Sequence, residues 1–124
     1  MAEAGQGLCG LRILVVEDNF LVAEDLRELL SRHGCDVVGP VPRVEQGLGL
    51  LAERELDGAV LDINLGAETC FPIAAALQER RVPFLFLTGY SDRLSIPSSF
   101  AEVPMLSKPI DEPRLVSAAR QVFR

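Results

Sequence analysis

The sequence predicts a doubly wound α/β domain, in which one parallel sheet lies between two layers of helices. Short apolar runs of strand type alternate with amphipathic segments of helical period, which is typical of βαβ units. No linker, internal repeat or low-complexity tract interrupts this alternation. The chain has 124 residues, 48% of them hydrophobic, which is enough for one core and too short for two ordinary domains. We therefore expect a single domain over residues 11–124.

The first half of the chain has the pattern strand, helix, strand, helix, strand. Residues 11–16 (LRILVV) are an apolar run without helical period, as expected for a strand buried on both faces. Residues 20–33 carry leucines at helical spacing, and Gly34 stands where the end of a helix favours glycine. The next predicted elements are a strand at 36–41, a helix at 44–54 and a strand at 58–63 (GAVLDI).

The second half continues the same alternation with one weak segment. Residues 91–100 contain Pro97 and several serines, so any helix there is short or frayed. The other predicted elements are a helix at 70–80, strands at 83–87 and 104–107, and an amphipathic helix at 112–123. Five strands in (βα)5 order with right-handed crossovers predict the flavodoxin-like strand order 2-1-3-4-5, with the switch point between the first and third strands.

Charge and composition exclude several classes of partner. The net charge of −6 argues against nucleic acid, because domains that bind it usually carry a basic face. No apolar stretch approaches the roughly 18 residues of a membrane span, and residues 1–10 resemble a disordered leader and not a signal peptide. We therefore expect a soluble cytoplasmic protein without a membrane partner. The three cysteines lack zinc-site spacing and are interpreted as reduced thiols.

Polar side chains follow four of the predicted strands at the point where each strand ends. The carboxyl ends of parallel strands lie along one edge of a sheet, so residues far apart in the sequence meet there. We expect the following side chains to form one site: Glu17, Asp18, Asp62, Thr88 and Lys108.

The carboxylates of this group predict a magnesium site. Like charges a few ångströms apart raise one another's pKa unless a cation neutralises them, so the cluster either holds a proton or binds a metal. Oxygen ligands with solvent access suit Mg²⁺. Glu17, Asp18 and Asp62 supply the carboxylates, and the backbone carbonyl of Asn64 is a further candidate ligand.

Thr88 and Lys108 extend the prediction to phosphoryl chemistry. A hydroxyl, an ammonium and a divalent cation around one carboxylate can neutralise or hydrogen-bond the three peripheral oxygens of a phosphoryl group. Asp62 is then interpreted as a nucleophile that forms an acyl phosphate. Taken singly, Asp18 can be a helix cap and Thr88 an ordinary strand residue.

These motifs together resemble the receiver domains of two-component response regulators. The resemblance covers residues 11–123. It implies that Glu17, Asp18 and Asp62 bind Mg²⁺, and that Asp62 takes a phosphoryl group from a histidine kinase. It further implies that Thr88 and Lys108 respond to the phosphoryl group and that the Lys108-Pro109 bond is cis.

Two departures from ordinary receivers are informative. Met105 stands three residues before the lysine, where the family carries an aromatic switch residue, and residues 64–66 (NLG) replace the usual Met-Pro after the phosphoacceptor. With residues 86–90 (FLTGY), these changes resemble the atypical FAT GUY subfamily, which is named after its Phe-Ala-Thr-Gly-x-Tyr-like motif. Its members are commonly single-domain regulators that often work with kinases of the HWE class. Tyr90 either replaces the missing switch ring or simply packs on its loop.

Three functions from different classes remain open at this point. The first is a single-domain response regulator that acts through protein contacts and performs only self-directed phosphoryl transfer and slow autodephosphorylation. The second is an interaction module with the receiver fold that works without phosphorylation. The third is a small phosphatase with Asp62 as a turnover nucleophile, which usually requires a general acid and a cap that the sequence does not offer.

Overall fold

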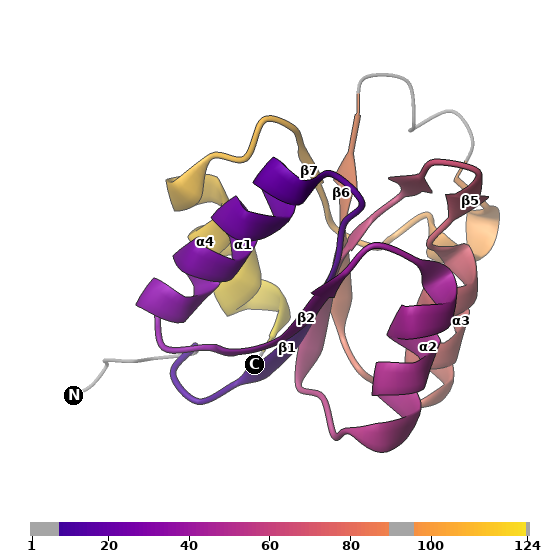
Figure 1. The fold of residues 1–124 in the computed structure, drawn as a ribbon, viewed down its shortest axis with the longest axis horizontal. Coiled ribbons are helices and arrows are strands. Elements are labelled where there is room, and N and C mark those ends of the chain that lie inside the picture. The colour runs from indigo at the N-terminus through magenta and orange to yellow at the C-terminus, as the bar shows by residue number, and fades with distance from the viewer. Residues whose placement is uncertain (1–7, 90–95, 124) are drawn as a thin grey trace.

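The computed structural model describes residues 8–89 and 96–123, which form a three-layer α/β fold (Figure 1). The main sheet contains β1 (Arg12–Val16), β2 (Asp36–Val41), β3 (Gly58–Asp62), β6 (Phe84–Thr88) and β7 (Met105–Ser107). The helices are α1 (Phe20–Arg32), α2 (Val44–Glu53), α3 (Phe71–Glu79), α4 (Glu112–Val122) and the 3-10 helix η2 (Ser98–Phe100). A separate hairpin consists of β4 (Asn64–Leu65) and β5 (Glu68–Thr69).

The order of the main sheet is β2-β1-β3-β6-β7, and all its strands are parallel. Since β6 and β7 are the predicted fourth and fifth strands, the structure confirms the flavodoxin-like order 2-1-3-4-5 in one domain. In the register, Val16 at the end of β1 pairs with Leu61 of β3. The residues that follow β1 and β3 therefore emerge side by side at the switch point.

The sheet separates two hydrophobic cores, because successive strand residues point to opposite faces. In β6, Phe84 and Phe86 pack with α2 and α3, whereas Leu85 and Leu87 pack with α1 and α4. Figure 1 shows the two pairs of helices on opposite sides of the sheet. Every residue of β3 and β6 is buried, which explains why these strands are continuous apolar runs without alternation.

Four phenylalanines connect α3, β6 and η2. The Phe100 ring stacks on Phe71 at 5.5 Å and meets Phe84 and Phe86 edge-on at 6.4 and 5.9 Å. This packing anchors the single turn of η2, which lies within residues 96–100, the part of the weak predicted segment that the structure describes. Its residues 91–95, together with Tyr90, lie outside the described residues.

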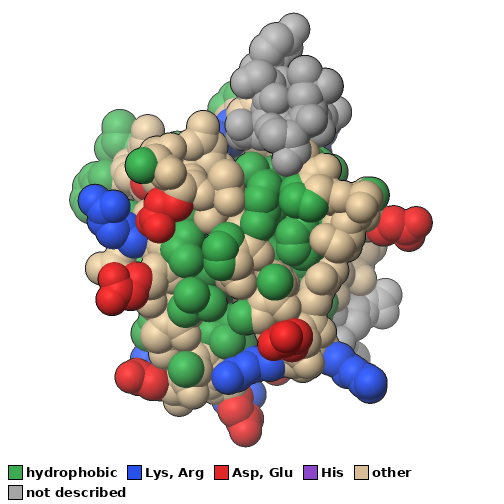
Figure 2. All heavy atoms as spheres, turned by 90° about the vertical axis from the view of Figure 1, so that its right-hand side faces the viewer, with side chains coloured by type: hydrophobic (Ala, Val, Ile, Leu, Met, Phe, Trp, Pro, Cys, Tyr) green, Lys and Arg blue, Asp and Glu red, His purple; other side chains and the backbone are tan. Residues whose placement is uncertain are grey.

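Close packing of α2 against α3 completes one layer. A Cβ atom at Gly47 of α2 would lie 2.7 Å from Ile73 Cδ1, so glycine permits the approach of the two helices. No residue of α3 before Glu79 is charged. Figure 2 accordingly shows hydrophobic side chains across the middle of this side of the molecule, with charged side chains at its margin.

Side chains next to the helices determine where α1 and α4 begin. Asn19 accepts hydrogen bonds from the backbone N–H groups of Leu21 and Val22, and Asp111 accepts one from Arg114 N–H. Both are N-caps of the usual kind. The role of α1 cap therefore belongs to Asn19 and not to Asp18, which leaves the Asp18 carboxylate available to the site.

The structure departs from the sequence prediction at two places. It contains the β4–β5 hairpin directly after β3, which the sequence did not predict. The leader predicted for residues 1–10 is described only from Leu8, and Leu8–Gly10 form a turn in which the Leu8 side chain is buried. These three residues therefore belong to the packed domain.

The predicted cis bond at Lys108-Pro109 is confirmed, and Gly39-Pro40 is also cis.

Candidate functional site

Four of the side chains predicted to meet at the carboxyl edge of the sheet, those of Glu17, Asp18, Asp62 and Lys108, do so. Glu17 follows β1, Asp62 ends β3, Thr88 ends β6 and Lys108 follows β7. Lys108 Nζ lies 3.1 Å from Glu17 Oε1 and 3.1 Å from Asp62 Oδ2. Carboxylate oxygens of Glu17, Asp18 and Asp62 lie within 4.8 Å of one another. The result is a compact acidic cluster with one ammonium group against it.

Glu17 is held in place by the start of α1 and by the lysine. Its side chain is almost completely buried, and its Oε2 accepts hydrogen bonds from Asn19 N–H at 3.0 Å and from Lys108 Nζ at 3.2 Å. Asn19 therefore has two roles, because its side chain caps α1 while its backbone orients Glu17. Asn19 was not among the residues predicted from the sequence, although an Asn directly before an amphipathic helix is a recognisable cap signal.

Asp62 is buried beside a second carboxylate, and both circumstances oppose its ionisation. Burial, followed by the charge of Glu17 and a hydrogen bond with it, raises the pKa of Asp62 to about 8, while Lys108 acts in the opposite direction. Only 2% of the residue is exposed. In the absence of a cation other than Lys108, the cluster therefore holds a proton near neutral pH, as the sequence predicts for crowded carboxylates.

Lys108 stays charged although it is partly buried. Burial acts to lower its pKa, but the charges of Asp62 and Glu17 and their hydrogen bonds outweigh it, so that the pKa of Lys108 is raised. Its backbone N–H donates to Thr88 O at 3.0 Å. This bond fixes the start of the loop after β7 against the end of β6 and brings the lysine to the acidic cluster.

The Thr88 hydroxyl is fully buried, and its Oγ1 has no hydrogen-bond partner among the described residues. A buried hydroxyl without a partner is unfavourable by roughly 1–3 kcal/mol, and such groups are rare in folded proteins. The register pairs Asp62 with Leu87, which places Thr88 one residue further along the same edge. A ligand oxygen bound at Asp62 can supply the missing partner.

The donor set fits a divalent cation with a preference for oxygen. Three carboxylates with converging oxygens, one of them on the exposed Asp18, provide charge compensation and leave room for water ligands, as Mg²⁺ requires. Asn64 lies two residues beyond Asp62, on β4, and its side-chain Oδ1 accepts a hydrogen bond from Gly66 N–H. That its backbone carbonyl is a metal ligand stays a prediction.

The β4–β5 hairpin lies next to the acidic cluster. Gly66 has a φ of +81°, which favours glycine, and a Cβ atom there would lie 3.8 Å from Asp18 Oδ2. Leu65 is buried in the core, and Cys70 N–H donates to Ile63 O at the base of the hairpin. Asn64 and Gly66 are residues typical of turns, and together they could have indicated this hairpin.

Glu68 joins the hairpin to α2. Its Oε2 accepts a hydrogen bond at 3.2 Å from Val44 N–H, in the first turn of a helix whose own N-cap residue, Arg43, makes no side-chain cap bond. Replacing Glu68 by alanine should lower the free energy of unfolding by about 1 kcal/mol, the usual effect of losing a capping group. Urea denaturation measures it. The matched variant Glu53→Ala removes a carboxylate from the other end of α2 and should change stability by less than about 0.5 kcal/mol.

Equal losses in the two variants would show that Glu68 does not act as the cap.

Met105 and Tyr90 are the two residues that the sequence connects with a response to phosphorylation. Met105 is half-buried in β7 and pairs with Phe86 of β6, so the position that the resemblance assigns to an aromatic switch is occupied by a flexible thioether side chain. Tyr90, its proposed substitute, lies outside the described residues.

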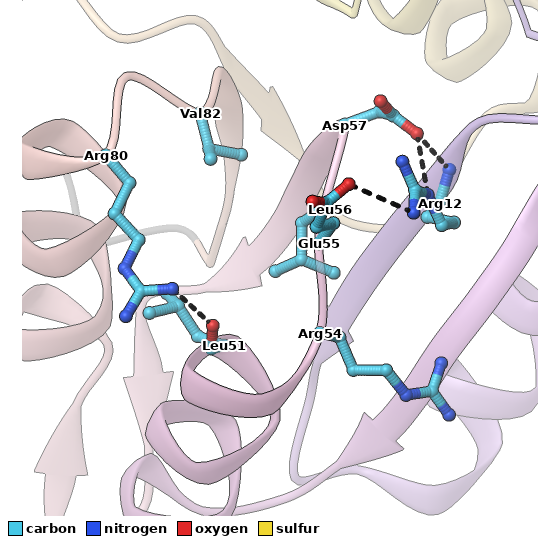
Figure 3. A pocket seen from close by; sticks show the side chains of 8 residues that line it. All are labelled: Arg12, Leu51, Arg54, Glu55, Leu56, Asp57, Arg80 and Val82. Atoms are coloured by element: carbon cyan, nitrogen blue, oxygen red, sulfur yellow. Dashed lines mark hydrogen bonds and ion pairs between the residues drawn. The ribbon is translucent and has the colours of Figure 1, made fainter.

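A hollow lies at the edge of the sheet opposite the acidic cluster. It has a volume of about 270 Å³, and Arg12, Asp57 and Val82 place it at the amino-terminal ends of β1, β3 and β6 (Figure 3). Asp57 Oδ2 accepts hydrogen bonds from the backbone and side chain of Arg12, and Arg80 donates to Leu51 O. Arg12 and Arg80 are thus held by partners within the protein, and we place the functional site at the acidic cluster.

Comparisons of this chain with known proteins agree on one family. Residues 13–120 match the model of the response regulator receiver domain. The sensory transduction protein LytT of Bacillus anthracis is 30% identical over 114 residues, which cover 90% of this chain and 46% of LytT. The phyllosphere-induced regulator PhyR of Methylorubrum extorquens is 30% identical over 122 residues, which cover 94% of this chain and 45% of PhyR. The chain thus spans about half the length of these relatives.

Solved structures agree with this assignment. The solution structure of SdrG from Sphingomonas melonis Fr1 has a TM-score of 0.79 at 37% identity and covers 91% of this chain and 98% of SdrG. The BeF3-activated conformation of SdrG from Pseudomonas melonis Fr1 has a TM-score of 0.72 at 38% identity, covering 89% and 96% of the two chains. With its parallel sheet and the acidic cluster at the switch point, the chain belongs to the response regulator receiver domain family.

Proposed function

We propose that this chain is a phosphorylation switch in which Asp62 accepts a phosphoryl group from a histidine kinase. The observation that carries the proposal is the combination of an ammonium at 3.1 Å from Asp62 Oδ2, two further carboxylates beside Asp62, and the partnerless buried hydroxyl of Thr88 at the end of the neighbouring strand. Each peripheral oxygen of a bound phosphoryl group then has a group to interact with. A structural salt bridge alone does not account for the Thr88 hydroxyl.

The transfer is a displacement at phosphorus. A carboxylate oxygen of Asp62 forms a bond to phosphorus, the P–N bond of the donor phosphohistidine breaks, and the departing imidazole retains the electron pair. Lys108 neutralises negative charge on the phosphoryl oxygens, and Thr88 donates a hydrogen bond to one of them. Hydrolysis of the acyl phosphate by water returns Asp62 and inorganic phosphate. We propose no other enzymatic activity for the chain.

Mg²⁺ is the cofactor that the acidic cluster fits. Glu17, Asp18 and Asp62 would hold it, with Asn64 as a further candidate ligand. When bound, the ion supplies positive charge that favours the ionised carboxylate of Asp62 and stabilises the phosphoryl oxygens. The raised pKa of Asp62 supports this requirement, because a protonated carboxyl is a poor nucleophile.

Phosphorylation by a small-molecule donor tests the proposal. In acetyl phosphate and Mg²⁺, the intact mass of the wild-type protein should increase by one phosphoryl group, and that of Asp62→Asn should not. Asp25→Asn, which removes an exposed carboxylate on α1, is the matched control and should react like the wild type. A phosphate adduct on the Asp62 variant, or none on the wild type with acetyl phosphate or a phosphorylated kinase, would contradict the proposal.

The finer features of the proposed function rest on the resemblance to the FAT GUY subfamily. We propose a single-domain regulator in the cytoplasm that receives its phosphoryl group from a kinase of the HWE class and acts through altered protein contacts. The PhyR relative supports a regulatory role, since its name describes it as a regulator. Among the described helices, none combines the length and the apolar character needed to cross a bilayer.

An interaction module that works without phosphorylation is the alternative. It shares the fold, so the acidic cluster is the feature that distinguishes the two functions. The test compares the affinity of a downstream protein partner for the wild type and for Asp62→Asn. If the two affinities are equal, with and without a phosphodonor, the alternative is correct.

A further inference from the structure

Two of the cysteines lie close together near the starts of β1 and β2. This is the edge of the sheet opposite the acidic cluster. The turn Leu8–Gly10 enters β1 beside the turn that connects α1 to β2. Gly10 N–H donates to Gly34 O at 2.8 Å, and Asp36 N–H donates to Leu11 O at 2.7 Å. Cys9 belongs to the first turn and Cys35 follows the second, so the backbone brings the two residues together although they are 26 positions apart.

Contacts of the side chains place the sulfur atoms within one small region. A Cβ atom at Gly34 would lie 3.1 Å from Cys9 Sγ, so Cys9 rests directly on the residue before Cys35. Cys35 Sγ lies 3.6 Å from Leu8 O, the carbonyl that precedes Cys9. Each thiol thus contacts a residue next to the other cysteine in the sequence.

The environments of the two thiols differ in a way that suits sequential oxidation. Cys9 is exposed, whereas Cys35 is buried in the core beneath α1. Burial, with a smaller contribution from the nearby Cys9 sulfur, raises the pKa of the Cys35 thiol to about 11. An external oxidant therefore meets Cys9 first, and Cys35 remains a protonated thiol until a reactive sulfur is formed beside it.

We propose that Cys9 and Cys35 form a redox-reactive pair that a small disulfide oxidant, such as oxidised glutathione, converts into an intramolecular disulfide. The Cys9 thiolate attacks one sulfur of the oxidant, the S–S bond breaks, and one glutathione thiolate leaves. Cys35 gives up its proton to solvent, and its sulfur attacks Cys9 Sγ and displaces the second glutathione thiolate. The two thiols are oxidised by two electrons, and the oxidant is reduced to two molecules of glutathione.

The product joins the turn at Leu8–Gly10 covalently to the start of β2. It closes a loop that contains the whole of β1 and α1, and the closure restricts the unfolded chain. Cys70 lies in the other core, with no exposed surface, and cannot reach either partner across the sheet. It provides an internal control for general oxidation of the protein.

Peptide mapping tests the proposal on the intact, folded chain. The protein is incubated with oxidised glutathione, remaining thiols are blocked with N-ethylmaleimide in urea, and the chain is digested with trypsin. Cleavage after arginine puts each cysteine in a peptide of its own, at 1–12, 33–43 and 55–80. We expect peptides 1–12 and 33–43 to be joined by a disulfide that dithiothreitol reverses, and peptide 55–80 to carry the maleimide.

Variants separate the two steps. Cys35→Ser should stop at a glutathione adduct on Cys9, Cys9→Ser should not react while folded, and Cys70→Ser should form the same linked peptides as the wild type.

In the oxidised wild type, the midpoint of urea denaturation should rise, and reduction should restore it. A wild-type protein that keeps glutathione on Cys9 with Cys35 free, or that forms only Cys9-linked dimers, would overturn the proposal. Neither result affects the proposed role of Asp62.

Discussion

Replacing Asp62 by asparagine should stabilise the metal-free protein at neutral pH and remove the loss of stability that Asp62 causes between about pH 4 and pH 8. Below about pH 4 the Asp62 carboxyl is neutral in both the folded and the unfolded chain. Above that pH the unfolded chain loses the proton, while the folded chain retains it until the pH passes about 8, the raised pKa of Asp62. The unfolded state therefore binds fewer protons in this window, and the free energy of unfolding falls as the pH rises.

The expected size of this effect is large for a single side chain. Each unit of pKa difference corresponds to about 1.4 kcal/mol, so the stability lost between about pH 4 and pH 8 should reach a few kcal/mol. Asparagine has no carboxyl to ionise, so the variant escapes this loss.

Urea denaturation at a series of pH values, with a chelator present, measures the difference. The exposed variant Asp25→Asn should follow the wild-type curve. If the curves of wild type and Asp62→Asn run parallel from about pH 5 to pH 8, Asp62 is ionised in the folded protein and its pKa is not raised. Such a result would leave the geometry of the site unchanged and would remove the proton as a competitor of Mg²⁺.

Replacing Phe86 by alanine should destabilise the domain by about 3–5 kcal/mol, the usual range for a buried phenylalanine. Phe86 is fully buried in the middle of β6 and contacts the rings of Phe71, Phe84 and Phe100. Its loss leaves a cavity between the sheet and α3, and it removes one of the three rings that anchor η2. Cavity formation and lost transfer free energy act in the same direction.

The same substitution at Phe20 is the matched control. Phe20 is 74% exposed at the start of α1, so Phe20→Ala should change stability by less than about 0.5 kcal/mol. Phe86→Leu, which fills part of the cavity, should lie between the two alanine variants. Thermal and urea denaturation both report these differences. Equal effects at Phe86 and Phe20 would mean that the ring cluster does not support the fold.

The sequence predicted the architecture because the strands of this domain are buried on both faces. Runs such as residues 58–62 and 84–88 are apolar at every position before their final polar residue, whereas a strand with one face in water usually alternates apolar and polar residues. The positions of Glu17, Asp62, Thr88 and Lys108 followed from the same reasoning. Each terminates or follows a buried strand, and parallel strands place their carboxyl ends at one edge.

The β4–β5 hairpin could not be predicted from periodicity. Its strands have two residues each, too few for a periodic pattern, and its placement depends on the buried Leu65 and on the contact of Glu68 with α2. The turn at Leu8–Gly10 was missed for a related reason. Its composition resembles a disordered leader, and only the space beneath α1 decides that Leu8 is buried.

The sequence by itself determined the sheet order, the edge on which the polar residues meet and the chemical types available there. These depend on local periodicity and chain order, which a single sequence contains. The tertiary structure alone decided that the Asp62 carboxyl is buried against Glu17, that the Thr88 hydroxyl has no partner among the described residues, and that Cys9 lies beside Cys35. Such features depend on distance and solvent exclusion between segments remote in the chain, which composition and spacing do not specify.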